Sequence, residues 1–278
     1  MQEEMEDVPA EPFNPDDFAA AETVDGSRPE GEEDPLSSAG LFEGDIANFD
    51  PSARNAIRSD YYRWPDNTVP YIITKEFSKT ERSIIFKAMK EYHDKTCIKF
   101  KGRTTEPDYI YIRKGKGCSS CIGRCRGKQE LILSDGIADG HYYTCVNIGT
   151  VIHEFMHAVG FYHEQSRTDR DDFVTINYHN IKAEEANRNY RNFKKHTQVK
   201  INHLGEKYDY CSVMHYGEYF WSKVNRMIFS LIVPRSCSGL GRVEDDRTEE
   251  ESYGLQKDRT EGWVLCHGHQ EDQQTVQV

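Results

Sequence analysis

Residues 153–163 read HEFMHAVGFYH, the most informative segment of the chain. His153 and His157 are four residues apart, so on a helix they lie on one face, one turn from each other. His163 follows from another direction, after a turn. Three imidazoles that converge in this way can bind a zinc ion, whose bonds to nitrogen are about 2.0–2.1 Å long, and they leave a fourth position open. The stretch therefore predicts a zinc site of the catalytic type, with His153, His157 and His163 as ligands.

Two further residues of the stretch fit this geometry. Glu154 follows the first histidine directly, which places its carboxylate beside the metal instead of on it. Gly160 can adopt a left-handed backbone conformation, so it can end the helix and turn the chain back. A bare His-Glu-x-x-His also occurs by chance on surface helices. The third histidine and the glycine argue against that alternative.

The sequence SVMHY at residues 212–216 completes a longer pattern. The eleven-residue zinc motif followed by a methionine-containing turn is the signature of the metzincin zinc peptidases. Within that class, GFYHE after the helix and MHY at the turn resemble the astacin family of secreted zinc endopeptidases. The resemblance implies an α+β fold with two lobes. The N-terminal lobe would hold a twisted, mostly parallel sheet and two long helices, the C-terminal lobe would be mostly irregular, and the active-site cleft would lie between them.

The resemblance also assigns roles to residues. It implies one Zn²⁺ ion per catalytic domain, and Glu154 as the general base that takes a proton from water and passes it to the leaving amine. Tyr216 would ligate the zinc at rest and donate its hydroxyl to the oxyanion in the transition state; a buried structural tyrosine is the alternative. Met214 would pack beneath the metal without ligating it. Protein or peptide substrates would bind in extended form along a strand edge at residues 118–124.

The acidity of the chain is concentrated at its N-terminus. Residues 1–54 carry 16 acidic and 2 basic side chains, a net charge of −14, against −12 for the whole chain. Residues 1–40 contain too little apolar side chain to offset the entropy of ordering, so we expect them to be largely disordered. Residues 42–46, FEGDI, resemble the latency motif of astacin prosegments. By that resemblance Asp45 binds the zinc and displaces its water in the latent form, with Phe42 and Ile46 as anchors; the alternative is a Gly-Asp turn in a linker.

Residues 55–57, Asn-Ala-Ile, resemble the start of a mature astacin. We therefore expect residues 1–54 to be a prosegment, removed by a trypsin-like protease at the Arg54–Asn55 bond. By the same resemblance the new N-terminus pairs with Glu164, because a buried ammonium needs a buried carboxylate. A solvated acid at a helix end is the other interpretation of Glu164. The catalytic domain would run over 55–266, with a divergent part at 223–266, and a polar tail would follow at 267–278.

The eight cysteines suggest disulfides and an oxidising compartment. By resemblance the pairs are Cys97–Cys266 and Cys118–Cys145. For the other four, proximity suggests Cys121–Cys125 and Cys211–Cys237, although spacing does not establish connectivity. Alternatively, CSSC at residues 118–121 could be half of a structural zinc site, but the sequence holds no second pair with this spacing.

We expect a secreted, extracellular protein from the resemblance and the cysteines. Residues 1–7 are acidic and lack the apolar segment of a signal peptide. We therefore expect the sequence to be incomplete at its start, with loss of secretion as the alternative. No apolar run approaches the length of a membrane span, and no basic patch indicates a nucleic-acid partner.

Alternation and capping signals predict the elements of the N-terminal lobe. Apolar alternation predicts strands at residues 69–74, 97–100, 109–112 and 129–134, and a later one at 174–176. Ser78 and Glu81 form a capping box, and Ile85, Met89 and Tyr92 follow on one face of the helix that it starts.

The resemblance covers residues 41–222 and weakens beyond Lys223. An active zinc endopeptidase made as a zymogen is the favoured function, because an inactive protein has no chemical need for Glu154. The alternative is a catalytically inactive relative that acts as a binding module. A cytosolic zinc-binding regulator is the third hypothesis, and free thiols would favour it.

Overall fold

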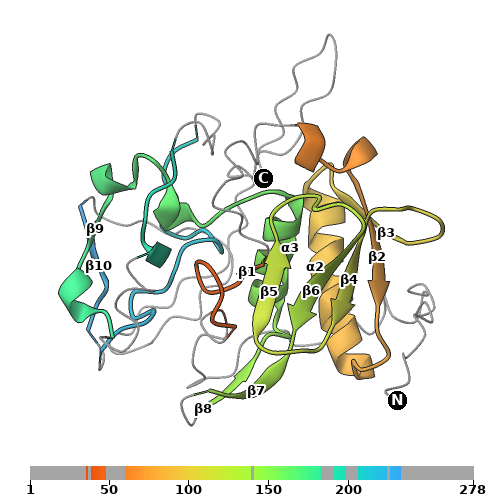
Figure 1. Ribbon diagram of the computed structural model, residues 1–278, viewed down its shortest axis with the longest axis horizontal. Helices are drawn as coiled ribbons and strands as arrows, with labels where there is room; N and C mark the ends of the chain where they lie inside the picture. Colours follow the sequence, from red (N-terminus) through yellow and green to blue (C-terminus); the bar gives the residue numbers. More distant parts are fainter. Residues whose placement is uncertain are drawn as a thin grey trace, which may run out of the picture.

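A mixed sheet of six strands forms the N-terminal half of the molecule (Figure 1). The computed structural model describes residues 36, 39–47, 60–138, 141–182, 191–197, 206–223 and 226–232. The strands follow the order β1-β5-β6-β4-β2-β3. Their bounds are Ile46–Ala47 (β1), Thr68–Ile73 (β2), Lys99–Gly102 (β3), Tyr109–Arg113 (β4), Cys118–Cys121 (β5) and Lys128–Leu133 (β6). Strands β6, β4, β2 and β3 are parallel, whereas β5 is antiparallel to β6.

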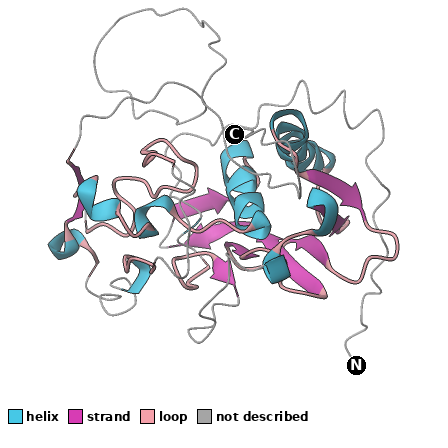
Figure 2. Cartoon of the chain, turned by 90° about the horizontal axis from the view of Figure 1, so that it is seen from above, coloured by secondary structure: helices cyan, strands magenta, loops and turns pink. Residues whose placement is uncertain are grey.

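Two helices pack on one face of this sheet (Figure 2). Helix α2 (Lys79–Lys95) begins at the predicted capping box, in which the Ser78 side chain accepts from the Glu81 N–H and the Glu81 carboxylate accepts from the Ser78 N–H. The predicted face of α2 is buried against the sheet. Its last member, Tyr92, donates its hydroxyl to the Ile152 carbonyl of helix α3 (Ile148–Val159) at 2.9 Å. This hydrogen bond links α2 directly to α3, the helix that carries the zinc motif.

The described part of the C-terminal half is mostly turns. Within it lie the antiparallel pair β9 (Val174–Ile176) with β10 (Phe229–Leu231) and the short 3-10 helices η4 (Glu164–Ser166), η5 (Arg170–Asp172) and η6 (Tyr178–Asn180). The remaining elements are the 3-10 helices η2 (Asp60–Tyr62) and η3 (Pro65–Asn67) and the hairpin β7 (Asp135–Ala138) with β8 (His141–Thr144). The expected α+β architecture, with a mostly parallel sheet, two helices and an irregular second lobe, is confirmed.

Some element boundaries differ from the sequence prediction. Strand β3 begins at Lys99 and not at Cys97, because the preceding residues complete the end of α2: Thr96 N–H donates to Tyr92 O, and Ile98 N–H donates to Thr96 Oγ1 at 2.9 Å. Strand β10 lies beyond residue 222, where the resemblance had weakened.

Two of the four expected disulfides lie within the described residues. Cys118 pairs with Cys145, as the resemblance implied, and Cys121 pairs with Cys125, as proximity suggested. Both cysteines of residues 118–121 are thus in disulfides and do not form half of a zinc site. Cys97 and Cys211 are also disulfide-bonded. Their expected partners, Cys266 and Cys237, lie outside the described residues together with the Arg54–Asn55 bond and the tail at 267–278.

Among the described residues, no helix combines the length and the apolar character that a membrane crossing needs.

Candidate zinc site

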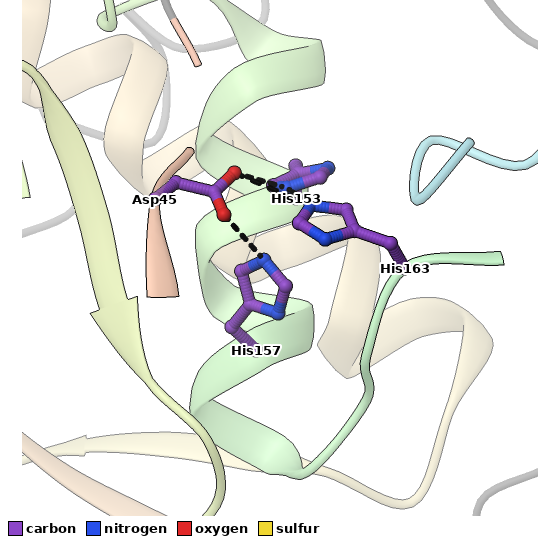
Figure 3. Close-up of side chains that lie close together, drawn as sticks. All are labelled: Asp45, His153, His157 and His163. Carbon is purple, nitrogen blue, oxygen red and sulfur yellow. Dashed lines mark hydrogen bonds and ion pairs between the residues drawn. The ribbon is translucent and has the colours of Figure 1, made fainter. Parts of the chain in front are cut away.

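Four side chains from distant parts of the chain meet at one buried point (Figure 3). His153 and His157 come from one face of α3, His163 from the segment after it, and Asp45 from the segment before β1. The Asp45 carboxylate lies 3.0 Å from His153 Nε2, 3.4 Å from His157 Nε2 and 3.4 Å from His163 Nε2. The three histidines that the zinc motif singled out therefore meet at one point.

Local structure explains why His153 and His157 reach the site from one direction and His163 from another. Asn147 caps the start of α3, its side-chain oxygen accepting from the Thr150 N–H at 2.9 Å. Gly160 ends the helix with φ +119°, a conformation that other residues rarely adopt. The chain then turns back, and His163 enters from the side opposite the helix (Figure 3).

The outward nitrogens of the three histidines are also hydrogen-bonded. His153 Nδ1 donates to the Val213 carbonyl at 2.6 Å, and His157 Nδ1 donates to the Phe161 carbonyl at 2.7 Å. His163 Nδ1 donates to Glu43 Oε2 at 2.8 Å. Such bonds hold the proton on Nδ1 and leave each Nε2 lone pair directed at the common centre.

This donor set fits one zinc ion. The ligand atoms of Asp45, His153, His157 and His163 all lie within 4.8 Å of one another. Asp45 Oδ1 and His157 Nε2 are buried and make no hydrogen bond within the described residues; they lie 3.4 Å from each other, and each can be a ligand to a shared ion. Three nitrogens and one carboxylate oxygen are a combination that tetrahedral zinc accepts.

Glu154 lies in the same buried region but belongs to no ion pair of the described residues. Its side chain is fully buried, and neither carboxylate oxygen has a hydrogen-bond partner there. Burial, and then the negative charge of Asp45, raise the pKa of Glu154 well above its usual value. By contrast, His163 and His157 outweigh the effect of burial on Asp45 and hold its pKa well below the usual range. The pKa values of these two neighbouring carboxyl groups are thus shifted in opposite directions.

The turn around Met214 braces the third histidine. Met214 is buried, and its carbonyl accepts from the Glu164 N–H at 2.9 Å. The Gln165 side chain accepts from the Tyr216 N–H at 3.1 Å. The Tyr216 hydroxyl, expected as a zinc ligand in the active enzyme, here donates to the Glu43 carbonyl.

The segment that carries Asp45 occupies the edge of the sheet (Figure 1). Strand β1 runs parallel to β5, pairing Ile46 with Ser120, and the Ser120 N–H donates to the Asp45 carbonyl at 3.0 Å. The predicted anchors differ in depth, because Ile46 is buried and Phe42 is half-buried. Gly44 has φ +90°, and a Cβ there would lie 2.8 Å from the Leu36 carbonyl oxygen, so only glycine fits this turn.

Sequence reasoning did not single out three residues that the structure brings to this site: Glu43, Gln165 and His196. Glu43 is the variable residue of the latency motif, and His196 Nε2 lies 2.9 Å from its Oε1. The position of Glu43 inside FEGDI was the one available signal. Its partners are too far away in the sequence for any local pattern to reveal them.

Comparison with known proteins agrees with this geometry. The family model described as Astacin, a peptidase family, matches residues 56–240, so the similarity extends past residue 222. The zinc metalloproteinase nas-4 of Caenorhabditis elegans is 41% identical over 191 residues, which cover 65% of this chain and 57% of that protein. Meprin A subunit beta of Rattus norvegicus is 42% identical over 179 residues, covering 64% of this chain and 23% of that protein. The chain thus spans little more than half the length of nas-4 and under a quarter of the meprin subunit.

A solved structure supports the same assignment. High choriolytic enzyme 1, a hatching enzyme zinc-protease from Oryzias latipes, matches with a TM-score of 0.53 and 36% sequence identity. The match covers 68% of this chain and 86% of that one. Because the family model covers more than half of the residues, and the expected histidines converge where such a protein binds zinc, the chain belongs to the astacin family of zinc metallopeptidases.

Proposed function

We propose that this chain is a zinc-dependent endopeptidase made as a zymogen, in which Asp45 holds the zinc site in a latent state. One observation carries the proposal. The Asp45 carboxylate is fully buried and lies within 3.4 Å of all three Nε2 atoms, in the position that a substrate or water would need. Removal of the segment opens that position, which is the open coordination site of catalytic zinc centres.

When bound, zinc supplies a Lewis acid that polarises the scissile carbonyl and lowers the pKa of a coordinated water to about 7. Glu154 takes the proton of the attacking water and passes it to the leaving amine. Its buried carboxylate has no competing partner among the described residues, which supports this role. Loss of the Asp45 charge on activation also removes one of the two causes that raise the pKa of Glu154, so the carboxylate ionises more readily.

Tyr216 supplies the hydroxyl that supports the oxyanion. In the latent arrangement this hydroxyl is bonded to the Glu43 carbonyl, and the backbone of Tyr216 is held by Gln165. Departure of residue 43 frees the hydroxyl, whereas the Gln165 contact stays. The segment with Asp45 and Glu43 thus blocks two parts of the catalytic site. Asp45 occupies the fourth ligand position, and the Glu43 carbonyl holds the hydroxyl of the oxyanion donor, Tyr216.

The substrate binds in extended form along β5. The Ser120 N–H, which now donates to the Asp45 carbonyl, becomes available to a peptide when the prosegment leaves. Pairing with an exposed strand edge is a common way to hold an extended peptide. Proteins or peptides with an unstructured segment are therefore the substrate class.

Activation occurs by cleavage at Arg54–Asn55 by a trypsin-like protease, and the new N-terminus then pairs with Glu164. The family match begins at residue 56, next to this bond. Burial raises the pKa of Glu164 to about 7, against the opposing effects of Arg167 and the Asp209 N–H. An incoming ammonium would stabilise the ionised form of this carboxyl group, which supports the pairing.

The disulfides Cys118–Cys145 and Cys121–Cys125 support a secreted enzyme, because disulfides persist in oxidising compartments.

The proposal is tested by cleavage of casein before and after trypsin treatment, with trypsin then blocked by its own inhibitor. We expect activity only after treatment, and none in a zinc-chelated sample or in Glu154→Gln that has bound its zinc. A variant on α2, Glu91→Gln, is the matched control and keeps full activity. Zinc bound at one equivalent without cleavage of any peptide would contradict the proposal and favour the inactive binding module.

A further inference from the structure

The three histidines differ in where their second hydrogen bond goes. His153 and His157 donate to backbone carbonyls at residues 213 and 161, which remain in the chain after activation. His163 donates to Glu43 Oε2, which belongs to the prosegment. One of the three ligands is therefore oriented by a group that leaves when the prosegment leaves.

Glu43 is held through its backbone and through one carboxylate oxygen. Its N–H donates to Asn192 Oδ1 at 2.9 Å, and its carbonyl accepts from the Tyr216 hydroxyl. Of its two carboxylate oxygens, one accepts from His163 and the other lies 2.9 Å from His196 Nε2. The side chain is fully buried, and the backbone has φ +47°, an unfavourable conformation for a residue other than glycine. The surrounding contacts must stabilise this conformation, so the position of the carboxylate is fixed by the fold.

A carboxylate bonded to the outer nitrogen of a metal-binding histidine has two effects. It fixes the tautomer with the lone pair on Nε2, and it makes the imidazole a stronger donor. A carboxylate does this more strongly than the neutral carbonyls that serve His153 and His157, because its hydrogen bond is charge-assisted.

We propose that the prosegment delivers a second carboxylate, Glu43, which orients His163 and tightens zinc binding in the uncleaved chain beyond what Asp45 alone provides. The prosegment thus has a function besides blocking the site, since it prepares the third ligand to receive the metal before activation. This inference rests on the proposed function, because it takes the four-residue group as the zinc site and residues 1–54 as a prosegment. It assigns Glu43 as a positioning residue that does not touch the metal.

The test measures the zinc affinity of the full, uncleaved chain by competition with a chromogenic chelator. Glu43→Gln keeps the size of the side chain and removes its charge, and Glu43→Ala removes the acceptor altogether. We expect zinc affinity to fall by about 10–100-fold in the alanine variant, the range found for loss of such partners, and by a smaller factor in the glutamine variant.

Asn192→Ala separates this effect from simple loosening of the prosegment. It removes the acceptor of the Glu43 N–H and leaves the carboxylate on His163. We expect its zinc affinity to stay within about threefold of the wild type, because the orienting hydrogen bond is kept. Hydrogen exchange of the Ser120 N–H, which donates to Asp45, reports in each variant whether the prosegment is docked.

Two results would overturn the inference: unchanged zinc affinity in both Glu43 variants, or an equal loss in Asn192→Ala. If the wild-type chain and both Glu43 variants bind zinc with the same affinity, only this inference is wrong. The proposed function is then unaffected. A wild-type chain that binds no zinc would contradict both.

Discussion

Asp45 and the three histidines come from three segments of the chain and converge on one buried point. The histidines direct Nε2 at the Asp45 carboxylate, and the outer nitrogens are all bonded. The ligand atoms of the four side chains lie within 4.8 Å of one another, a spacing that a single zinc ion can bridge.

Replacement of Asp45 by alanine tests its role in latency. We expect the uncleaved Asp45→Ala chain to cleave casein at a rate between that of the uncleaved and the trypsin-activated wild type. The variant opens the fourth ligand position but leaves β1 on the sheet edge and Glu43 on Tyr216. Asp94→Ala, which removes an exposed carboxylate of α2, is the control and should stay latent. An Asp45→Ala chain that is as inactive as the uncleaved wild type would argue against Asp45 as the latency residue.

Tyr216 is the second residue whose role can be isolated. We expect activated Tyr216→Phe to lose about 10²–10³-fold in kcat, the usual effect of removing one oxyanion donor, with little change in KM. The ring remains to pack between its aromatic neighbours, so the fold and the zinc content should be unchanged. Tyr219→Phe, at an exposed neighbouring tyrosine, should leave kcat unaltered. Equal kcat values for Tyr216→Phe and the wild type would mean that Tyr216 is a structural tyrosine.

The sequence predicted these residues to different degrees. Spacing was enough for His153, His157 and Glu154, because one helical turn brings the two histidines together. Glu43 was missed as an individual residue, since its contact with His163 spans 120 positions and follows from the way residues 39–47 lie along the edge of the sheet. No local pattern encodes such a contact.

At the scale of elements, the zinc helix depends on its C-terminal glycine. Gly160 has φ +119°, and a Cβ there would meet nothing within 4 Å. The cost of Gly160→Ala is therefore conformational, and we expect the free energy of unfolding to fall by about 1–3 kcal/mol. Zinc affinity should fall as well, because the turn sets the direction from which His163 arrives.

Gly217→Ala is the matched control for this prediction. A Cβ at Gly217 also meets nothing within 4 Å, but its φ does not lie in the left-handed region. Urea unfolding of both zinc-bound variants should show a smaller loss for Gly217→Ala. Equal losses would mean that backbone conformation is not what makes Gly160 necessary.

Element prediction succeeded where a local signal existed. The capping box placed the start of α2, and alternation placed β2, β4 and β9 to within a residue. Strand β1 could not be found in this way, because two residues carry no periodicity and their pairing is with β5, more than 70 residues later. Strand β5, which β1 covers, was predicted from the family resemblance and not from alternation in its sequence.

At the scale of the molecule, one disulfide attaches strand β5 to the segment just before α3, and a second closes the short loop after β5. Cys118–Cys145 closes a segment with a sequence separation of 27, from β5 to the start of α3, whereas Cys121–Cys125 spans a separation of 4. In the chain-entropy model the longer loop gives the larger stabilisation. We expect removal of both cysteines of the first pair to lower the free energy of unfolding by about 3–4 kcal/mol, and of the second pair by about 2 kcal/mol.

Alanine replacement of each pair, with urea unfolding of the zinc-bound chains, checks this order. A larger loss for Cys121–Cys125 would indicate that the short disulfide does more than restrict the unfolded chain, for instance by holding the loop whose Gly123 N–H donates to the His157 carbonyl at 2.8 Å.

The segment at residues 39–47, which we propose belongs to a prosegment, connects the two halves of the molecule. It pairs with β5 through the backbone of residues 45–47, and through Glu43 it contacts Asn192, His196 and Tyr216 in the other half. Whole-molecule organisation was predicted well by resemblance, because the lobes follow from the family fold. The contacts of Glu43 with Asn192, His196 and Tyr216 were not predicted, because they join residues that lie about 150 or more positions apart in the sequence.

The most direct test of the account is the position of zinc in crystals of the uncleaved, zinc-loaded chain, located by anomalous diffraction at the zinc edge. We predict one zinc ion bound by the Nε2 atoms of His153, His157 and His163 and by an Asp45 oxygen at about 2.0–2.2 Å. Zinc held by the histidines with water or Tyr216 in the fourth position, and Asp45 turned away, would contradict the claim that this carboxylate keeps the enzyme latent.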